Sequence, residues 1–117
     1  MFESEPFIIP PVLNKVGMRD EPILRVVWTL AREALLQASS VTFLGYSMPE
    51  TDLAARFLFS ETLNGRPVNI RVVNIGDRLA ARTIRSAYHT VLPVIPKQNF
   101  DWNGARKWIE EKRFQAE

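Results

Sequence analysis

One stretch, residues 41–52, constrains the fold of this chain more than any other. It opens with Val41, Phe43 and Leu44, whose β-branched and aromatic side chains suit a buried strand. Gly45 follows at the point where the apolar run stops, and glycine lets a backbone turn sharply. The stretch therefore predicts a buried parallel strand that ends in a tight turn.

A helix is predicted directly after this turn. Ser47 lies three residues before Glu50, which is the spacing of a capping box, and Pro49 fits only the first turn of a helix. In open α/β sheets, ligands bind outside the carboxyl ends of the strands and against helix N-termini, where free N–H groups favour phosphate. The turn is therefore the place where a nucleotide would bind in such a fold.

The rest of the chain alternates in the same way. Strands are predicted at residues 7–13, 68–74 and 91–96. The first and last are short or at an edge, because their prolines cannot donate to a ladder. Helices are predicted to begin near Asp20, Thr51, Asp77, and Asp101 or Asn103.

This alternation predicts an α/β fold with a parallel sheet and right-handed crossovers. We expect one domain over residues 1–117, with three to four strands flanked by helices and the option of a mixed edge. Such a sheet is about half of a complete dinucleotide-binding fold, a Rossmann-like half domain. Arg71 argues against a central position for the strand at residues 68–74, because strands buried on both faces are almost wholly apolar.

Composition narrows the function classes. The 15 basic and 13 acidic residues leave a net charge of +2, so nucleic-acid binding, which needs a clustered basic patch, is not expected. The chain has no cysteine, which excludes disulfides and cysteine zinc sites. No basic and apolar leader opens the sequence, and no apolar run approaches the roughly 20 residues of a membrane span. A cytoplasmic location is the default expectation.

The helices carry more apolar surface than a small sheet can cover. The first helix has two apolar stripes, Ile23, Val26, Val27, Leu30 and Ala34, and Leu24, Trp28, Ala31 and Leu35. The second is apolar over a wide arc through Phe57, Leu58, Phe59 and Leu63. Exposed apolar faces favour association, so a homodimer or another protein partner is expected, with Trp28 and Phe59 as anchors.

Several segments together suggest a family. They are residues 7–11, Trp28, Ala31, Ala38, residues 43–52, Ala55, Arg56 and residues 72–74. In this order they resemble the C-terminal part of bacterial sirtuin-like domains, over most of the chain to about Asp77. Sirtuin-like proteins have a Rossmann-type domain that binds NAD, and they remove acyl groups from lysine or, in bacterial defence proteins, hydrolyse NAD.

The resemblance implies a set of ligand contacts. Gly45, Tyr46 and Ser47 would occupy the turn beside NAD, Asn74 would contact the adenosine ribose, and Asp77 would lie nearby. The family's glycine-rich loop, catalytic histidine and ribose-side asparagine motif all precede the matched region and have no counterpart in this chain. The resemblance thus implies NAD or ADP-ribose as a ligand, without a catalytic or metal-binding residue and without a required cofactor.

Each predicted contact also has a structural interpretation. Gly45 and Ser47 suit any turn from strand to helix, Asn74 suits a strand end, and Tyr46 suits a packing position. These alternatives stay open at the level of sequence.

The roles of His89 and of three arginines are also considered from their sequence pattern. His89 is a single imidazole without a nucleophile or metal partner in its pattern, which is typical of a packing or surface residue. Arg78, Arg82 and Arg85 share one helical face, which is either solvated or binds an anionic partner.

Two functions follow from these observations. The first is a non-catalytic remnant of a sirtuin-like domain that serves as an interaction or self-assembly module, with a residual adenine-nucleotide pocket. The second is an NAD or ADP-ribose binding subunit that completes an enzyme with a partner chain. For the isolated chain, binding or assembly is favoured over catalysis.

Overall fold

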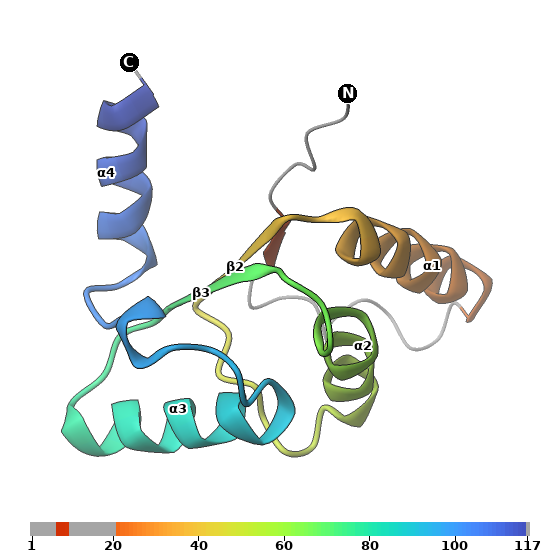
Figure 1. Cartoon of the computed structure of the whole chain (residues 1–117), viewed down its shortest axis with the longest axis horizontal. Coiled ribbons are helices and arrows are strands. Elements are labelled where there is room, and N and C mark those ends of the chain that lie inside the picture. The colour runs from red at the N-terminus through yellow and green to blue at the C-terminus, as the bar shows by residue number, and fades with distance from the viewer. Residues whose placement is uncertain (1–6, 10–20, 117) are drawn as a thin grey trace.

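The fold is a small α/β domain built on a parallel sheet (Figure 1). The computed structural model describes the backbone of residues 7–9 and 21–116 and the side chains of residues 25–112. The elements in chain order are β1 (Phe7–Ile9), α1 (Glu21–Gln37), β2 (Ser40–Leu44), α2 (Leu53–Leu63), β3 (Asn69–Val73), α3 (Arg78–Val91), the 3-10 turn η2 (Lys97–Asn99), β4 (Phe100–Asp101) and α4 (Ala105–Ala116).

The sheet has the order β1-β2-β3-β4, with each neighbouring pair parallel. The α/β class and the parallel sheet are therefore confirmed, and none of the four strands runs antiparallel. The order follows the chain, as in one half of a doubly wound sheet. Arg71 counted against a central position for the strand at 68–74, but β3 is central, since it pairs with both β2 and β4. Arg71 is accommodated because its side chain is only half-buried.

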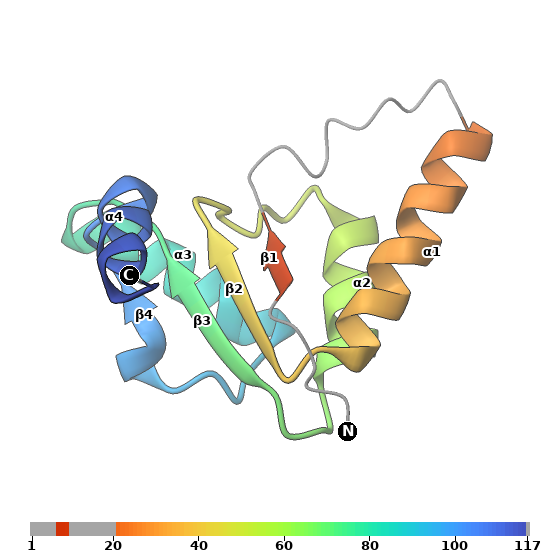
Figure 2. The same ribbon diagram turned by 90° about the horizontal axis from the view of Figure 1, so that it is seen from above.

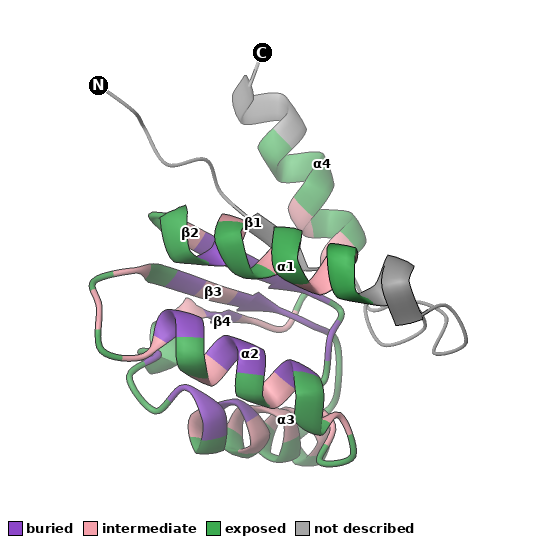
Figure 3. Cartoon of the chain, turned by 90° about the vertical axis from the view of Figure 1, so that its right-hand side faces the viewer, coloured by how far each residue is buried: buried purple, intermediate pink, exposed green. Residues whose placement is uncertain are grey.

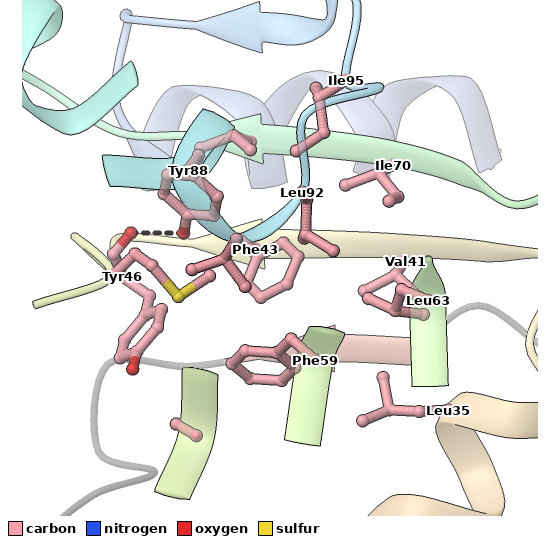
Figure 4. Packing of buried hydrophobic residues seen from close by; sticks show 14 of the residues in the cluster. Leu35, Val41, Phe43, Tyr46, Phe59, Leu63, Ile70, Tyr88, Leu92 and Ile95 are labelled. Carbon is pink, nitrogen blue, oxygen red and sulfur yellow. Dashed lines mark hydrogen bonds between the residues drawn. The ribbon is translucent and has the colours of Figure 1, made fainter. Parts of the chain in front are cut away.

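Helices α1, α2 and α3 pack into one core. Because every crossover joins adjacent strands in the same sense, right-handed connections place these helices on one face. Figure 1 shows α2 and α3 on that side and α4 standing off from the other, and Figure 2 shows α1 beside α2. The core includes Leu35 of α1, Phe59 and Leu63 of α2, Tyr88 of α3, and the strand residues Val41, Phe43 and Ile70 (Figure 4), together with Val72.

The aromatic centre of this core is Phe43 of β2. Its ring lies 4.9 Å from that of Phe59 at 86° and 5.2 Å from that of Tyr88 at 75°. These edge-to-face contacts are the arrangement that aromatic quadrupoles favour. The expectation that Phe59 anchors a dimer was therefore wrong, because its side chain is fully buried inside the domain.

Among its described side chains, helix α1 turns part of its apolar surface toward the core and leaves part exposed. Leu35 is fully buried, and Trp28 and Ala31 pack against the core. Val26 and Leu30 of the other stripe are 58% and 60% exposed, which fits the expectation that the sheet cannot cover all of the apolar surface. The reason is that α1 packs on one side only, against α2, and its outer surface faces solvent (Figure 3).

Helix α2 begins later than its capping-box pattern predicts. The N-cap is Asp52, whose carboxylate accepts a hydrogen bond from the Ala55 N–H at 3.3 Å. Asp52 also accepts a hydrogen bond from the Tyr46 hydroxyl at 2.6 Å. Ser47, the predicted cap, makes no side-chain hydrogen bond in the described part of the chain. Residues 46–51 consequently form a loop, and the predicted start near Ser47 and Thr51 moves to Leu53.

The last strand lies further along the chain than predicted. Residues 91–96 form the end of α3 and the loop after it, and the strand is β4 at Phe100–Asp101. Val91 completes α3, and its carbonyl accepts a hydrogen bond from the Asn64 amide at 2.8 Å, which holds the helix end in place. Pro93 and Pro96 then keep the chain from pairing, because they lack the N–H that a ladder needs.

The outer elements, β1 and α4, agree only in part with the predictions. Helix α4 follows Gly104, whose carbonyl accepts from the Trp108 N–H at 3.2 Å, so the cap is neither Asp101 nor Asn103. Strand β1 is short and at the edge, as predicted. Residues 10–13 of the expected first strand and the expected cap at Asp20 lie outside the described residues. No helix in the described part of the chain is long and apolar enough to cross a membrane.

Candidate functional site

The loops at the carboxyl ends of β2 and β3 hold all five residues predicted to contact a ligand. Gly45 turns the chain out of β2 with a φ of 68°, a conformation that glycine adopts without strain. Its N–H donates to the Val73 carbonyl at 2.8 Å, which continues the β2 to β3 pairing by one residue. Gly45 and Ser47 are exposed at this edge.

Tyr46 is buried and serves the fold. Its ring packs on Phe43 and Phe59 with centroids 6.4 and 6.1 Å apart, and its hydroxyl donates to Asp52. Burial raises the pKa of Tyr46 well above that of a free tyrosine, and the hydrogen bond to Asp52 raises it further. The neutral phenol is thus the stable form, and it links the loop to the start of α2.

The remainder of this loop is held by Arg56. Its guanidinium donates to the Met48 carbonyl at 2.8 Å and to the Pro49 carbonyl at 3.0 Å. Met48 has a φ of 57°, unusual for a residue with a side chain, and is fully buried. The burial of Met48 and the two hydrogen bonds hold this conformation in place.

Asn74 ties three loops together. Its amide nitrogen donates to the Tyr46 carbonyl at 3.3 Å, and its amide oxygen accepts from the Ile75 N–H at 2.9 Å. Its backbone N–H donates to the Asp101 carbonyl at 2.8 Å. The Tyr88 hydroxyl also donates to the Tyr46 carbonyl, at 2.5 Å (Figure 4). Asn74 is buried, and its side-chain amide and backbone N–H form hydrogen bonds within the protein.

Asp77 caps the next helix. Its carboxylate accepts from the Ala80 N–H at 2.8 Å, and the residue is otherwise exposed. The structure therefore brings Tyr46 and Asn74 into direct contact and gives Asp77 a separate role at α3. Among the predicted ligand residues, Ser47 alone presents a side chain that makes no hydrogen bond in the described part of the chain.

His89 has a packing role. Its Nε2 lies 3.0 Å from the Ile95 carbonyl oxygen, and its ring meets that of Phe100 at 79° with centroids 5.4 Å apart. Within the described ranges, no group of three or more His, Asp and Glu side chains is placed to hold a metal ion.

Two grooves stand out that sequence analysis did not predict. The first, of about 450 Å³, runs along α3 and is lined by Gly76, Asp77, Arg78, Ala81, Arg82, Arg85, Lys97 and Trp102. The arginines have a signal in the sequence, a spacing that places them on one helical face. Lys97 and Trp102 have no such signal in the sequence, because they come from η2 and the segment after β4.

The second groove, of about 440 Å³, lies between α1 and α2. It is lined by Arg25, Trp28, Thr29, Arg32, Ala54, Phe57, Leu58 and Glu61. Arg32 and Glu61 form an ion pair across it at 2.6 Å. The apolar character of both helices is visible in the sequence, but the pairing of these residues across the groove is not.

Comparison with known proteins gives no indication of function, so the proposals below rest on the geometry of the structure. No protein-family model, curated protein or solved structure matches this chain. The resemblance to sirtuin-like domains stays a prediction that rests on the residues quoted above.

Proposed function

We propose that this chain is a non-catalytic interaction module that self-associates through the surface formed by α1 and α2. The observation that carries the proposal is the exposure of two residues of α2: Phe57, which lines the groove between these helices and is 69% exposed, and Leu53, which lies one helical turn before it and is 73% exposed. Moving one such side chain out of water is worth roughly 1.5–3 kcal/mol. Two copies of the surface would bury four of them.

The surface is suited to pair with itself. A twofold contact requires that one patch carry both halves of each interaction. Here Phe57, which is 69% exposed, forms part of the wall of a groove of about 440 Å³, so an exposed apolar side chain and a groove occur on the same face. Arg32 and Glu61 already pair with each other across the groove, so together they bring no net charge to a contact with a second copy. A second copy of this chain is therefore the partner that the surface fits best.

The polar residues at the carboxyl edge favour assembly over turnover. The polar side chains of three residues there form hydrogen bonds that hold loops and helix caps, namely Tyr46, Asn74 and Asp77. His89 packs against Phe100 and lies beside the Ile95 carbonyl. General acid–base catalysis needs a base within reach of a substrate proton, and none of these groups is free to act as one.

Sedimentation equilibrium over a wide range of protein concentration tests the proposal. The parent chain is expected to form dimers at tens of micromolar. Phe57→Ser and Leu53→Ser should each weaken the dimer at least tenfold, because each removes an apolar contact from both copies.

Leu79→Ser is the matched control. Leu79 is a leucine of α3 that is 71% exposed, close to the 73% of Leu53, and it lies outside the α1–α2 groove. Its substitution should leave the dimer unchanged. A parent chain that stays monomeric at the highest concentration, or an equal loss with Leu79→Ser, would overturn the proposal.

A further inference from the structure

The groove along α3 gathers positive charge from separate parts of the chain. Arg78, Arg82 and Arg85 come from one face of α3, and Lys97 comes from η2. Trp102 adds an aromatic wall, with one face stacked on Phe100 at a centroid distance of 5.8 Å. We call this set the α3 basic groove.

These cations lack the counter-charges that normally accompany a solvated face. Residues 78–91 contain no aspartate or glutamate. In the described part of the chain, the side chains of Arg78, Arg82, Arg85 and Lys97 form no ion pair and no hydrogen bond. The one carboxylate that lines the groove, Asp77, accepts from the Ala80 N–H as the helix cap.

The arrangement costs the free protein stability. Like charges at positions i and i+4 of a helix, here Arg78 and Arg82, repel each other and destabilise it. Arg78 also stands in the first helical turn, where the macrodipole disfavours a cation. An anion in the groove would relieve both effects and would also meet the first-turn N–H groups that have no intrahelical acceptor.

We propose that the α3 basic groove binds a polyphosphate ligand of the nucleoside di- or triphosphate class. Four cations against one carboxylate exceed what a single phosphate neutralises, so a chain of phosphates fits the charge. The groove volume of about 450 Å³ lies within the range of small-molecule sites, roughly 300–1,000 Å³. Trp102 supplies a surface on which a base stacks. This site is independent of the α1–α2 surface proposed for self-association.

Calorimetry with the full chain at low ionic strength tests this proposal, with ATP, inorganic triphosphate and a short single-stranded DNA as ligands. ATP is expected to bind, and added salt should weaken it because the groove is open to solvent. Arg82→Gln and Lys97→Gln should each weaken ATP binding about tenfold. Trp102→Leu should remove the preference for ATP over inorganic triphosphate.

Matched controls separate the groove from general charge attraction. Arg106→Gln and Lys107→Gln make the same chemical changes on α4, where Arg106 is 94% exposed. Both should leave ATP affinity unchanged. Arg82→Gln should in addition raise or maintain the stability of the free chain while it weakens binding, because it relieves repulsion.

Four outcomes would overturn the proposal. They are no ATP binding at millimolar concentration, equal losses in the groove and control variants, tighter binding of the DNA than of ATP, and equal affinity of the parent for ATP and inorganic triphosphate. Self-association measured on the same variants reports on the α1–α2 surface separately, so failure of one proposal is distinguishable from failure of the other.

Discussion

Tyr46 shows how one side chain organises the carboxyl edge of the sheet. Its ring packs in the core, its hydroxyl binds the cap of α2, and its carbonyl accepts hydrogen bonds from Asn74 and Tyr88. Each contact satisfies a polar group that burial would otherwise leave without a partner. The residue therefore couples β2, α2, β3 and α3 at one point.

The buried tyrosines predict a loss of stability at high pH. Burial raises the pKa of both Tyr46 and Tyr88 above the ordinary value near 10, so above pH ~10 the folded chain retains protons that the unfolded chain loses. Stability is then complete below pH ~10 and falls as the pH rises further, by up to about 1.4 kcal/mol per pH unit for each tyrosine. Urea denaturation from pH ~8 to pH ~11 measures this slope.

Tyr46→Phe isolates the contribution of one tyrosine, since all other titrating groups are shared with the parent. It should lower the free energy of unfolding at neutral pH by about 0.5–1.5 kcal/mol, the net worth of one hydrogen bond. It should also reduce the alkaline slope. Parallel curves for the two proteins would show that Tyr46 does not hold its proton in the folded state.

At the scale of elements, Arg66 joins the ends of two helices. Its guanidinium donates to the Thr62 carbonyl of α2 at 2.8 Å, to the Ala38 carbonyl at 3.0 Å, and to the Leu35 carbonyl of α1. Carbonyls in the last turn of a helix lack intrahelical donors and carry partial negative charge. The planar guanidinium fork of Arg66 thus binds carbonyls at the end of α2 and links this end to α1.

Replacing this fork should destabilise the helix pair. Arg66→Leu is expected to lower the free energy of unfolding by about 2–3 kcal/mol, because the carbonyls of three buried residues lose charged donors. Arg66→Lys should recover only part of this loss, since an ammonium lacks the planar geometry. Thermal and urea unfolding measure both changes.

Arg106→Leu serves as the control for Arg66, because its exposed ion pair with Glu110 is worth little. It should stay within about 0.5 kcal/mol of the parent. A lysine variant as stable as the parent would show that charge alone, and not the fork, stabilises these helix ends.

At the scale of the whole molecule, the sheet is half of a doubly wound fold, and its two proposed surfaces lie on different elements. In a complete fold of this class, ligands bind where the strand order reverses, and this sheet has no reversal among β1 to β4. The carboxyl edge is closed instead by hydrogen bonds among its own loops. The two surfaces proposed for partners and ligands run along helices, and the α3 basic groove reaches this edge at Gly76, Asp77 and Trp102.

The isolated chain is therefore expected to leave NAD intact. Positioning and a general base are both needed for turnover, and His89 is engaged with Ile95 and Phe100. Nicotinamide release, followed by chromatography, should not exceed that of buffer. Steady release that Ser47→Ala abolishes and Ser86→Ala preserves would contradict the expectation and reveal a site at the β2 turn.

Local patterns in the sequence were enough to predict the α/β class, the parallel sheet, the strands at β2 and β3 and the cap at Asp77. These features depend on side chains a few residues apart, through periodicity, turn chemistry and capping. Of the candidate site, the same patterns located the loops after β2 and β3 and the arginine face of α3.

Contacts between distant segments settled the rest. Phe57 and Phe59 are both aromatic and two residues apart, yet one is 69% exposed and the other fully buried, because α2 turns only one face to Phe43. The cap of α2 moved to Asp52 because Tyr46 reaches it. The α3 basic groove exists because η2 and β4 bring Lys97 and Trp102 to α3. Packing brings together residues whose separation along the chain leaves no periodic trace, and for that reason these features emerged only in three dimensions.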